Sequence, residues 1–295
     1  MQKYSIPRHI WRVIYPLLIF IGISLIVPFV AAIAYAVYFG IQTVATGGTL
    51  NPATIETFIF DFLLEASLWF LFVSNVISTL IFSLIWRKAR TRLPVYDNTK
   101  LRFLPAVLTA LLFVGLNLIL VSVMNLTDLT RHFPSHEVVS LLLTSGSFIM
   151  RIIVIGLIAP VAEELLFRGL IQNRLCAWMP TWVAVLLTNA LFGLIHFNLL
   201  QGLYAFVIGI FYSLLYLRYR NLWILIIGHV AFNLASVVLR EVLDAAGIVE
   251  INAWLFMIPS LLITVACILL LLKRTNPAAL IRPQETTPAI HVEGL

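Results

Sequence analysis

Charged residues are scarce in this chain: they make up 11% of its 295 residues, whereas a soluble domain has about 25%. Hydrophobic residues make up 61%. This composition excludes an ordinary soluble domain and indicates an integral membrane protein. Cysteine is also scarce. Cys176 and Cys267 are the two present, and they give neither a disulfide framework nor a metal-ligand spacing.

Two common hydrolase signatures are absent as well. The sequence contains no His-Glu-x-x-His pattern, which is typical of helical zinc proteases, and no Gly-x-Ser-x-Gly pattern, which is typical of serine hydrolases. Any hydrolytic chemistry in this chain therefore has to come from a different arrangement of polar residues.

Long apolar runs dominate what is present. A spanning helix needs about 20 mostly apolar residues, and we predict eight such helices, of which the fifth and sixth are short. They lie at residues 14–38, 66–86, 103–124, 151–172, 182–198, 203–217, 222–240 and 252–272. The predicted fold is an all-α polytopic bundle. Residues 55–65 predict an amphipathic helix on the outer interface, and residues 137–150 predict a similar lead-in to the fourth span.

Basic residues are distributed unevenly around these spans. With the N-terminus in the cytoplasm, every Lys and Arg falls on the cytoplasmic side except Arg131, Arg151 and Arg240. The positive-inside rule therefore predicts that both termini are cytoplasmic. The same distribution explains the net charge of +6 without a nucleic-acid partner. We expect Arg151, near the outer end of the fourth span, to snorkel to the outer headgroups.

Three polar motifs lie inside the predicted spans, where an ionisable side chain costs roughly 2.5–3.5 kcal/mol. They are Glu163-Glu164-x-x-x-Arg168, Phe192-x-x-x-His196 and His229-x-x-x-Asn233. Each one alone has a structural explanation: an ion-pair clamp, aromatic packing, a histidine bonded to a backbone carbonyl, or an amide that joins helices. Three such motifs together make a purely structural explanation much weaker.

Helical geometry separates the members of the first motif. Glu164 and Arg168 are four residues apart, share a face and can pair with each other. Glu163 is rotated by about 100° from Glu164. We therefore predict that Glu163 is free to face His196, His229 and Asn233 from neighbouring helices.

Such a set of residues could hydrolyse an acyl bond. A carboxylate in a partly dry cavity can act as general base toward water, and a histidine can orient that water and move its proton. A second histidine and an asparagine amide can stabilise the oxyanion. Alternatively, Glu163, His196 and His229 could bind zinc.

These ordered motifs resemble those of the CPBP (Abi) family, which includes type II CAAX prenyl endopeptidases, bacteriocin-processing and immunity proteins, and lysostaphin-resistance-like proteins. The match covers roughly residues 145–240. The resemblance implies an intramembrane endopeptidase in which Glu163 activates water together with His196, while His229 and Asn233 form the oxyanion site. Glu164, Arg168 and Phe192 would have structural or supporting roles.

The mechanism has two versions in this family, whose members have been described as metalloproteases and as metal-free glutamate proteases. We favour the metal-free version, because the amide oxygen of Asn233 is a poor zinc ligand, and keep zinc as the alternative. The expected substrate is a membrane-bound protein or peptide. A prenylated CAAX protein is the eukaryotic role of the family, whereas the compact length suits a prokaryotic plasma-membrane protein with another peptide substrate.

Two other functions are open at this point: a non-catalytic immunity or scaffolding protein of the same fold, and a proton-coupled transporter. We predict N-terminal spans over residues 1–136, a catalytic core over 137–250, a last span over 251–275 and a disordered cytoplasmic tail over 276–295. Counted along its helix from Trp182, His196 lies about 10 Å too near the outer face to meet Glu163 and His229. Either the start of the fifth span or its end at residue 198 must therefore shift.

Overall fold

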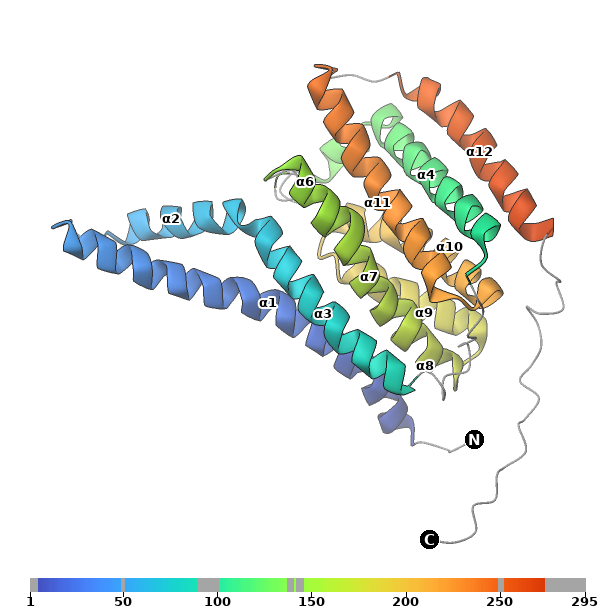
Figure 1. The fold of residues 1–295 in the computed structure, drawn as a ribbon, viewed down its shortest axis with the longest axis horizontal. Helices are drawn as coiled ribbons and strands as arrows, with labels where there is room; N and C mark the ends of the chain where they lie inside the picture. The colour runs from blue at the N-terminus through green and yellow to red at the C-terminus, as the bar shows by residue number, and fades with distance from the viewer. Residues whose placement is uncertain are drawn as a thin grey trace, which may run out of the picture.

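The computed structural model describes residues 5–48, 51–89, 101–136, 141, 146–248 and 252–273. This part of the chain is helical and contains no strand, which confirms the all-α prediction (Figure 1). The helices are α1 (Ile6–Ala45), α2 (Pro52–Glu65), α3 (Ser67–Ala89), α4 (Phe103–Leu126), the 3₁₀ helix η2 (Leu129–His132), α6 (Phe148–Arg151), the π-helical η3 (Ile152–Ile158), α7 (Ala159–Glu164), the π-helical η4 (Leu165–Gln172), α8 (Asn173–Cys176), α9 (Thr181–Leu194), α10 (Leu199–Tyr219), α11 (Leu222–Ala245) and α12 (Ala253–Lys273).

Within the described ranges, 6 helices are long and apolar enough to cross a membrane: α1, α3, α4, α10, α11 and α12. They correspond to six of the eight predicted spans. The fourth predicted span lies inside the continuous helical run from α6 to α8, which alternates between α- and π-helical pairing. The fifth corresponds to α9, which has only 14 residues.

The predicted end of the fifth span at residue 198 was wrong, as was the start of the sixth at residue 203. Helix α9 ends at Leu194, and α10 begins at Leu199. Phe197, in the turn between them, has a φ of 49°, in the left-handed region that reverses the chain. Asn198 then caps α10: its Oδ1 accepts a hydrogen bond from the Gln201 N–H at 2.9 Å, and its Nδ2 donates to Ser135 Oγ at 3.1 Å.

Helices α9 and α10 form a tight antiparallel hairpin because glycines face each other across it. A Cβ built at Gly193 would lie 2.6 Å from the Gly202 carbonyl oxygen, and a Cβ at Gly202 would lie 2.9 Å from the Gly193 oxygen. Small residues allow membrane helices to approach this closely. The contact lies one turn before the segment that carries His196.

We expect Gly193→Ala to destabilise the protein by about 1–3 kcal/mol, because the added methyl group meets rigid backbone. It should also lower any activity that depends on His196. The control is Gly22→Ala in α1, where a Cβ would meet nothing within 4 Å. That substitution should be neutral or slightly stabilising, because Ala is the better helix former. Thermal unfolding in detergent measures both effects, and equal stability of the two variants would contradict the close-contact explanation.

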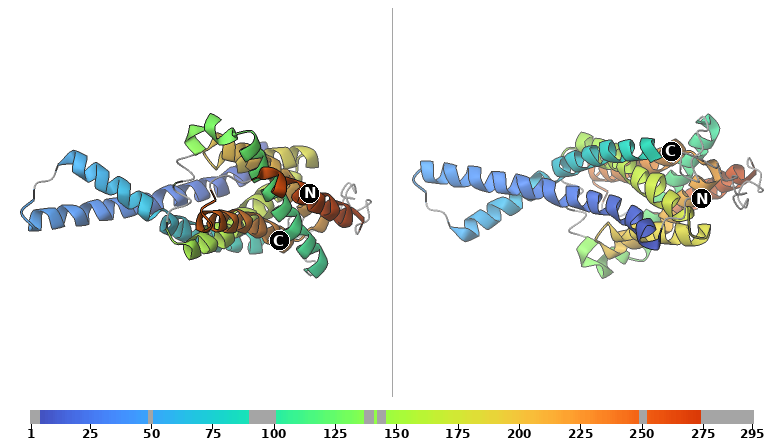
Figure 2. Two further views of the ribbon diagram at one scale, coloured as in Figure 1. Left: turned by 90° about the horizontal axis from the view of Figure 1, so that it is seen from above. Right: turned by 90° about the horizontal axis from the view of Figure 1, so that it is seen from below.

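Helix α1 is about 60 Å long at 1.5 Å per residue, roughly twice the thickness of the hydrocarbon core. Its first half packs on the bundle through Val13, Pro16 and Leu17, whereas its second half and α2 extend away from it (Figures 1 and 2). Ring stacking joins the two arms, with centroids 4.1 Å apart for Tyr35 and Phe62. The predicted helix at 55–65 is therefore present as α2; its place on the outer interface stays a prediction.

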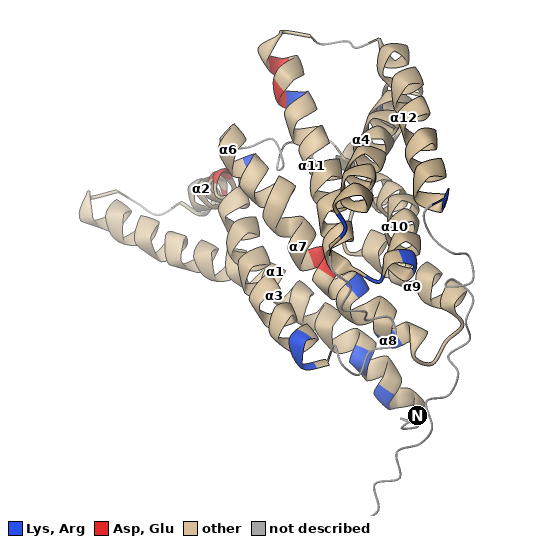
Figure 3. Ribbon diagram, turned by 45° about the vertical axis from the view of Figure 1, so that its right-hand side comes forward, with Lys and Arg blue, Asp and Glu red and all other residues tan. Residues whose placement is uncertain are grey.

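Lys and Arg gather at the end of the bundle where the N-terminus lies (Figure 3). This agrees with the pattern behind the predicted orientation, which itself stays a prediction. The expected snorkelling of Arg151 was wrong. Its Nη2 lies 2.5 Å from Glu241 Oε2, and only 11% of its side chain is exposed. The ion pair joins the last residue of α6 to the C-terminal part of α11. Most of the predicted lead-in at 137–150 and the predicted tail at 276–295 lie outside the described residues.

The core places α7 between α3 on one side and α11 on the other, while α4 lies between α11 and α12. Phe113 of α4 and Phe167 of η4 are fully buried in this packing. Close approach again depends on a glycine: a Cβ at Gly228 would lie 2.6 Å from the Phe113 ring. Helices from distant parts of the sequence thus converge around α7, which carries Glu163 and Glu164.

Candidate active site within the helical bundle

The helix that carries the acidic pair is irregular where it meets α11. Pro160 opens α7 and has no N–H to donate to a carbonyl of the preceding turn. The carbonyl of Ile155, five residues earlier in the π-helical η3, accepts a hydrogen bond from Asn233 Nδ2 at 2.9 Å. π-helical turns are frequent at functional sites because they redirect backbone groups. Here the irregularity joins the α7 helix to the motif on α11.

Glu163 points toward the imidazole of His229. The distance from Glu163 Oε2 to His229 Nε2 is 3.6 Å, which is longer than a hydrogen bond. The Glu163 side chain is 16% exposed and that of His229 is 6% exposed. The Tyr212 ring stacks on His229 at a centroid distance of 4.8 Å and keeps the imidazole in this plane.

Glu164 is fully buried and has two partners. Its Oε1 accepts a hydrogen bond from Arg168 Nη1 at 3.0 Å, which confirms the predicted pair. The same oxygen lies 2.9 Å from Nδ1 of His229. Sequence reasoning missed this second contact, because the two residues are 65 positions apart and no local spacing signals it. The neighbouring glutamates therefore lie at opposite nitrogens of one imidazole.

His196 lies in the turn after α9 rather than on the helix. Its Nδ1 lies 2.8 Å from the carbonyl oxygen of Phe192, so the ring folds back along α9. This removes the depth mismatch that regular helical geometry predicted. The Phe192 ring also contacts both imidazoles edge-on, with centroids 5.1 Å from His196 and 6.0 Å from His229. With Nδ1 donating to the carbonyl, Nε2 of a neutral His196 is an acceptor.

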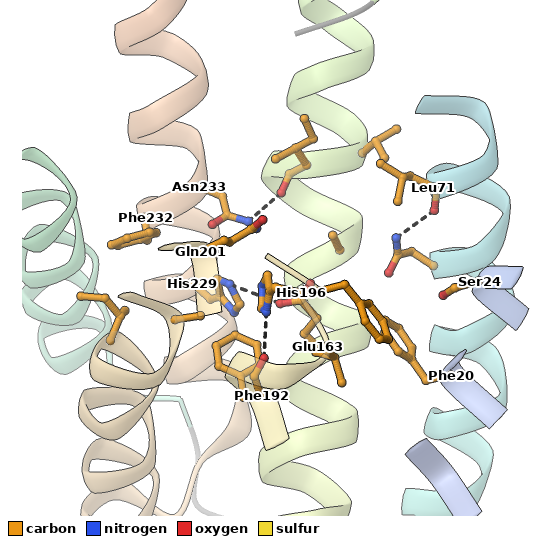
Figure 4. A pocket seen from close by; sticks show the side chains of 18 of the residues that line it. Phe20, Ser24, Leu71, Glu163, Phe192, His196, Gln201, His229, Phe232 and Asn233 are labelled. Atoms are coloured by element: carbon orange, nitrogen blue, oxygen red, sulfur yellow. Dashed lines mark hydrogen bonds and ion pairs between the residues drawn. The ribbon is translucent and has the colours of Figure 1, made fainter. Parts of the chain in front are cut away.

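Glu163, His196, His229 and Asn233 all line one cavity of about 510 Å³ (Figure 4). The structure thus brings together the four residues that we predicted from the sequence to be catalytic. Residues that sequence reasoning did not single out complete the walls: Phe20, Ser24 and Leu25 of α1, Leu71 and Asn75 of α3, and Gln201 and Tyr204 of α10. No sequence signal marked these residues, because none of them belongs to the three motifs.

Exposed apolar side chains contribute to the lining of the cavity. Two of its lining residues are highly exposed: Phe197 at 82% and Leu25 at 65%. They come from the α9–α10 turn and from α1, and α1 and α10 are both long enough to span a membrane. The cavity lining thus includes exposed apolar side chains beside helices long enough to span a membrane.

A metal site needs three or more ligands at short range. No group of three His, Cys, Asp or Glu residues stands close enough to hold a metal ion among the residues that the structure describes. Glu163 and His229 face each other, but His196 does not stand close enough to complete a set of three ligands with them. The described residues as arranged do not fit the zinc alternative.

Comparison with known proteins finds two matches over the same region. Residues 145–235 match the family "Type II CAAX prenyl endopeptidase Rce1-like". Over 91 residues the chain is 29% identical to YdiL of Bacillus subtilis (strain 168), which is named as a candidate membrane peptidase. That match covers 31% of this chain and 37% of YdiL. No solved structure matches the chain significantly.

The matched region holds every side chain of the three motifs and all four polar residues that converge on the cavity. Helices α1, α3 and α12 lie outside it, although α1 and α3 contribute to the cavity wall. Taken with the ordered motifs and the apolar helical bundle, the two matches show that residues 145–235 of this integral membrane protein are similar to the Type II CAAX prenyl endopeptidase Rce1-like family.

Proposed function

We propose that this chain is an intramembrane endopeptidase that hydrolyses a peptide bond of a membrane-associated protein or peptide. One observation carries the proposal. A carboxylate, Glu163, faces an imidazole at 3.6 Å inside a cavity that also holds His196 and Asn233. Water is the nucleophile that such a set can activate, because none of these four side chains is itself a serine or cysteine nucleophile.

Glu163 is the general base. A water molecule next to its carboxylate gives up a proton to it while the water oxygen attacks the carbonyl carbon of the peptide. Nε2 of a neutral His196 can accept the second hydrogen of that water and orient it. The low polarity of the cavity walls strengthens these electrostatic interactions.

His229 and Asn233 stabilise the oxyanion that forms. Nδ1 of His229 is engaged by Glu164, so its Nε2 donates to an oxyanion when the ring carries both protons. One N–H of the Asn233 amide is used by the Ile155 carbonyl, and the second is free to donate. When the C–N bond breaks, Glu163 returns its proton to the leaving amine.

The exposed apolar side chains in the cavity lining support a substrate that reaches the cavity from the bilayer. A peptide attached to a lipid, or part of a hydrophobic segment, would keep its apolar part against Phe197 and Leu25 while its backbone meets Glu163. A prenylated peptide is one member of this class, and the name of the matching family supports it.

The test is hydrolysis by the purified full chain in lipid vesicles. The probes are fluorogenic peptides carrying a farnesyl or a palmitoyl group, incubated in H₂¹⁸O. Endopeptidase activity predicts two peptide fragments, with one ¹⁸O in the new carboxylate. A non-catalytic immunity or scaffolding protein gives no fragments. A proton-coupled transporter gives proton flux in sealed vesicles with the peptides intact.

We expect His196→Gln to lower kcat in this assay by about 10²-fold, the lower range for a positioned acid or base. Glutamine keeps a polar side chain in the turn but cannot take part in proton transfer. The control is His132→Gln in η2, an exposed histidine away from the cavity, which should keep full activity. Wild-type turnover by folded His196→Gln would contradict the role assigned to this imidazole.

A further inference from the structure

Arg168 makes contacts beyond its pair with Glu164. Its Nη2 donates to Asn189 Oδ1 of α9 at 2.9 Å and to the Gly209 carbonyl oxygen of α10 at 3.0 Å. Arg168 and Asn189 are both 0% exposed. Each hydrogen bond that a buried guanidinium makes offsets part of the cost of removing the charge from water, although Nε of Arg168 has no hydrogen-bond partner among the described residues. Two further helices therefore hold the cation that pairs with Glu164.

The carboxamide of Asn189 is itself fixed in orientation. Its Nδ2 donates to the Val185 carbonyl oxygen at 2.8 Å and to Ser213 Oγ at 2.8 Å. With both amide hydrogens engaged on one side, its Oδ1 is directed at the guanidinium. Asn189 therefore presents its Oδ1 to Arg168 in one fixed orientation.

Gly209 provides the space for this contact. A Cβ at this position would lie 2.3 Å from Asn189 Oδ1 and 3.1 Å from Arg168 Nη2. Any larger residue would displace the two groups that meet there. The glycine, the asparagine and the arginine thus form one unit of complementary shape at the α9–α10 hairpin.

These contacts continue to the imidazole of the candidate site. Arg168 Nη1 and His229 Nδ1 share one oxygen, Glu164 Oε1, at 3.0 Å and 2.9 Å. The other nitrogen of the same imidazole, Nε2, faces Glu163. Movement of the guanidinium would move this oxygen and allow the ring to turn away from Glu163.

We propose that Asn189 is a positioning residue for His229, acting through Arg168 and Glu164. It does not line the cavity. It holds the guanidinium, the guanidinium holds the carboxylate, and the carboxylate fixes the ring so that Nε2 faces the cavity. The kinetic part of this inference rests on the proposed hydrolytic function; the structural part does not.

The kinetic test uses the fluorogenic lipid-anchored peptides in vesicles. We expect Asn189→Ala to lower kcat roughly 10- to 100-fold, because a small displacement of a catalytic group has effects of this size. KM should change little, because Asn189 does not line the cavity. Asn189→Asp keeps an oxygen acceptor for Arg168 but loses the amide donors to Val185 and Ser213, so it should recover only part of the lost kcat.

The matched control is Thr188→Ala. Thr188 is the neighbouring residue on α9, is also 0% exposed, and its Oγ1 has no hydrogen-bond partner among the described residues. It should keep wild-type kcat. If Asn189→Ala does not fold, Ser213→Ala replaces it. That variant removes one partner of the Asn189 amide and should lower kcat in the same direction, by a smaller factor.

A second readout needs no catalysis. In protein labelled with ¹⁵N-histidine, the Nδ1 resonance of His229, assigned by its loss in His229→Gln, reports the hydrogen bond to Glu164. It should shift in Asn189→Ala and stay in place in Thr188→Ala. An unchanged resonance together with unchanged kcat overturns the proposal. A shifted resonance in a protein that cleaves no peptide supports the positioning role and rejects the proposed function.

Discussion

Glu163→Gln should reduce peptide hydrolysis by about 10²–10⁴-fold, the range for loss of a positioned general base. The amide has the size of the carboxylate but cannot take a proton from water. The fold should survive, because the only described polar contact of Glu163 is to His229, at 3.6 Å. Initial rates with the lipid-anchored fluorogenic peptides in vesicles measure the effect, with thermal unfolding as the check on folding.

The matched control for this substitution is Glu56→Gln. Glu56 is an exposed glutamate on α2, away from the cavity that holds Glu163. Glu56→Gln should hydrolyse the peptides at the wild-type rate. Wild-type turnover by folded Glu163→Gln would remove the base from the mechanism and, with it, the endopeptidase proposal. A loss of activity in both variants would point to general damage rather than chemistry.

Arg168→Met should destabilise the protein by about 3–5 kcal/mol, the cost of leaving one member of a buried ion pair without its partner. The Arg168 and Glu164 side chains are both 0% exposed, so water cannot replace the lost partner. Asn189 and the Gly209 carbonyl would lose their donor at the same time. The free energy of unfolding, measured in mixed detergent–lipid micelles, gives the size of the effect.

Two comparisons separate charge burial from simple loss of contacts. The double variant Glu164→Gln with Arg168→Met removes both charges and should be more stable than Arg168→Met alone. Arg240→Met breaks a pair with Asp244 in which both side chains are more than half exposed, and should cost about 0–1 kcal/mol. Equal destabilisation by Arg168→Met and Arg240→Met would show that the buried charge is not what costs stability.

The pair of glutamates shows how far local spacing predicts the site. Four positions separate Glu164 from Arg168, and within a helix this spacing determines that they share a face. The offset of Glu163 followed from the same geometry. By contrast, the contact between Glu164 and His229 depends on how α7 packs against α11, and helix spacing contains no information about that packing. The pairing of Arg151 with Glu241, 90 positions away, is unpredictable for the same reason.

The turn after α9 shows a second feature that could not be predicted from the sequence. Ile195, Phe197 and Leu199 keep the local hydropathy high, so the hydropathy of the sequence does not predict the end of a helix there. The chain reverses at Phe197 without the glycine or proline that usually marks a turn. The hairpin is held by contacts between Gly193 and Gly202, which are tertiary. The depth of His196 could be obtained only from the folded hairpin.

The sequence by itself determined that the chain is a bundle of apolar helices carrying three polar motifs. Composition and helical periodicity are local properties, and a run of about 20 apolar residues is what a membrane-spanning helix requires. Only the tertiary structure decided which motif residues meet: Glu163 with His229 Nε2, Glu164 with His229 Nδ1, and Asn233 with the Ile155 carbonyl. The physical reason is that these contacts join side chains on different helices. Their distances depend on glycine contacts, π-helical turns and a left-handed turn residue that act together across the fold.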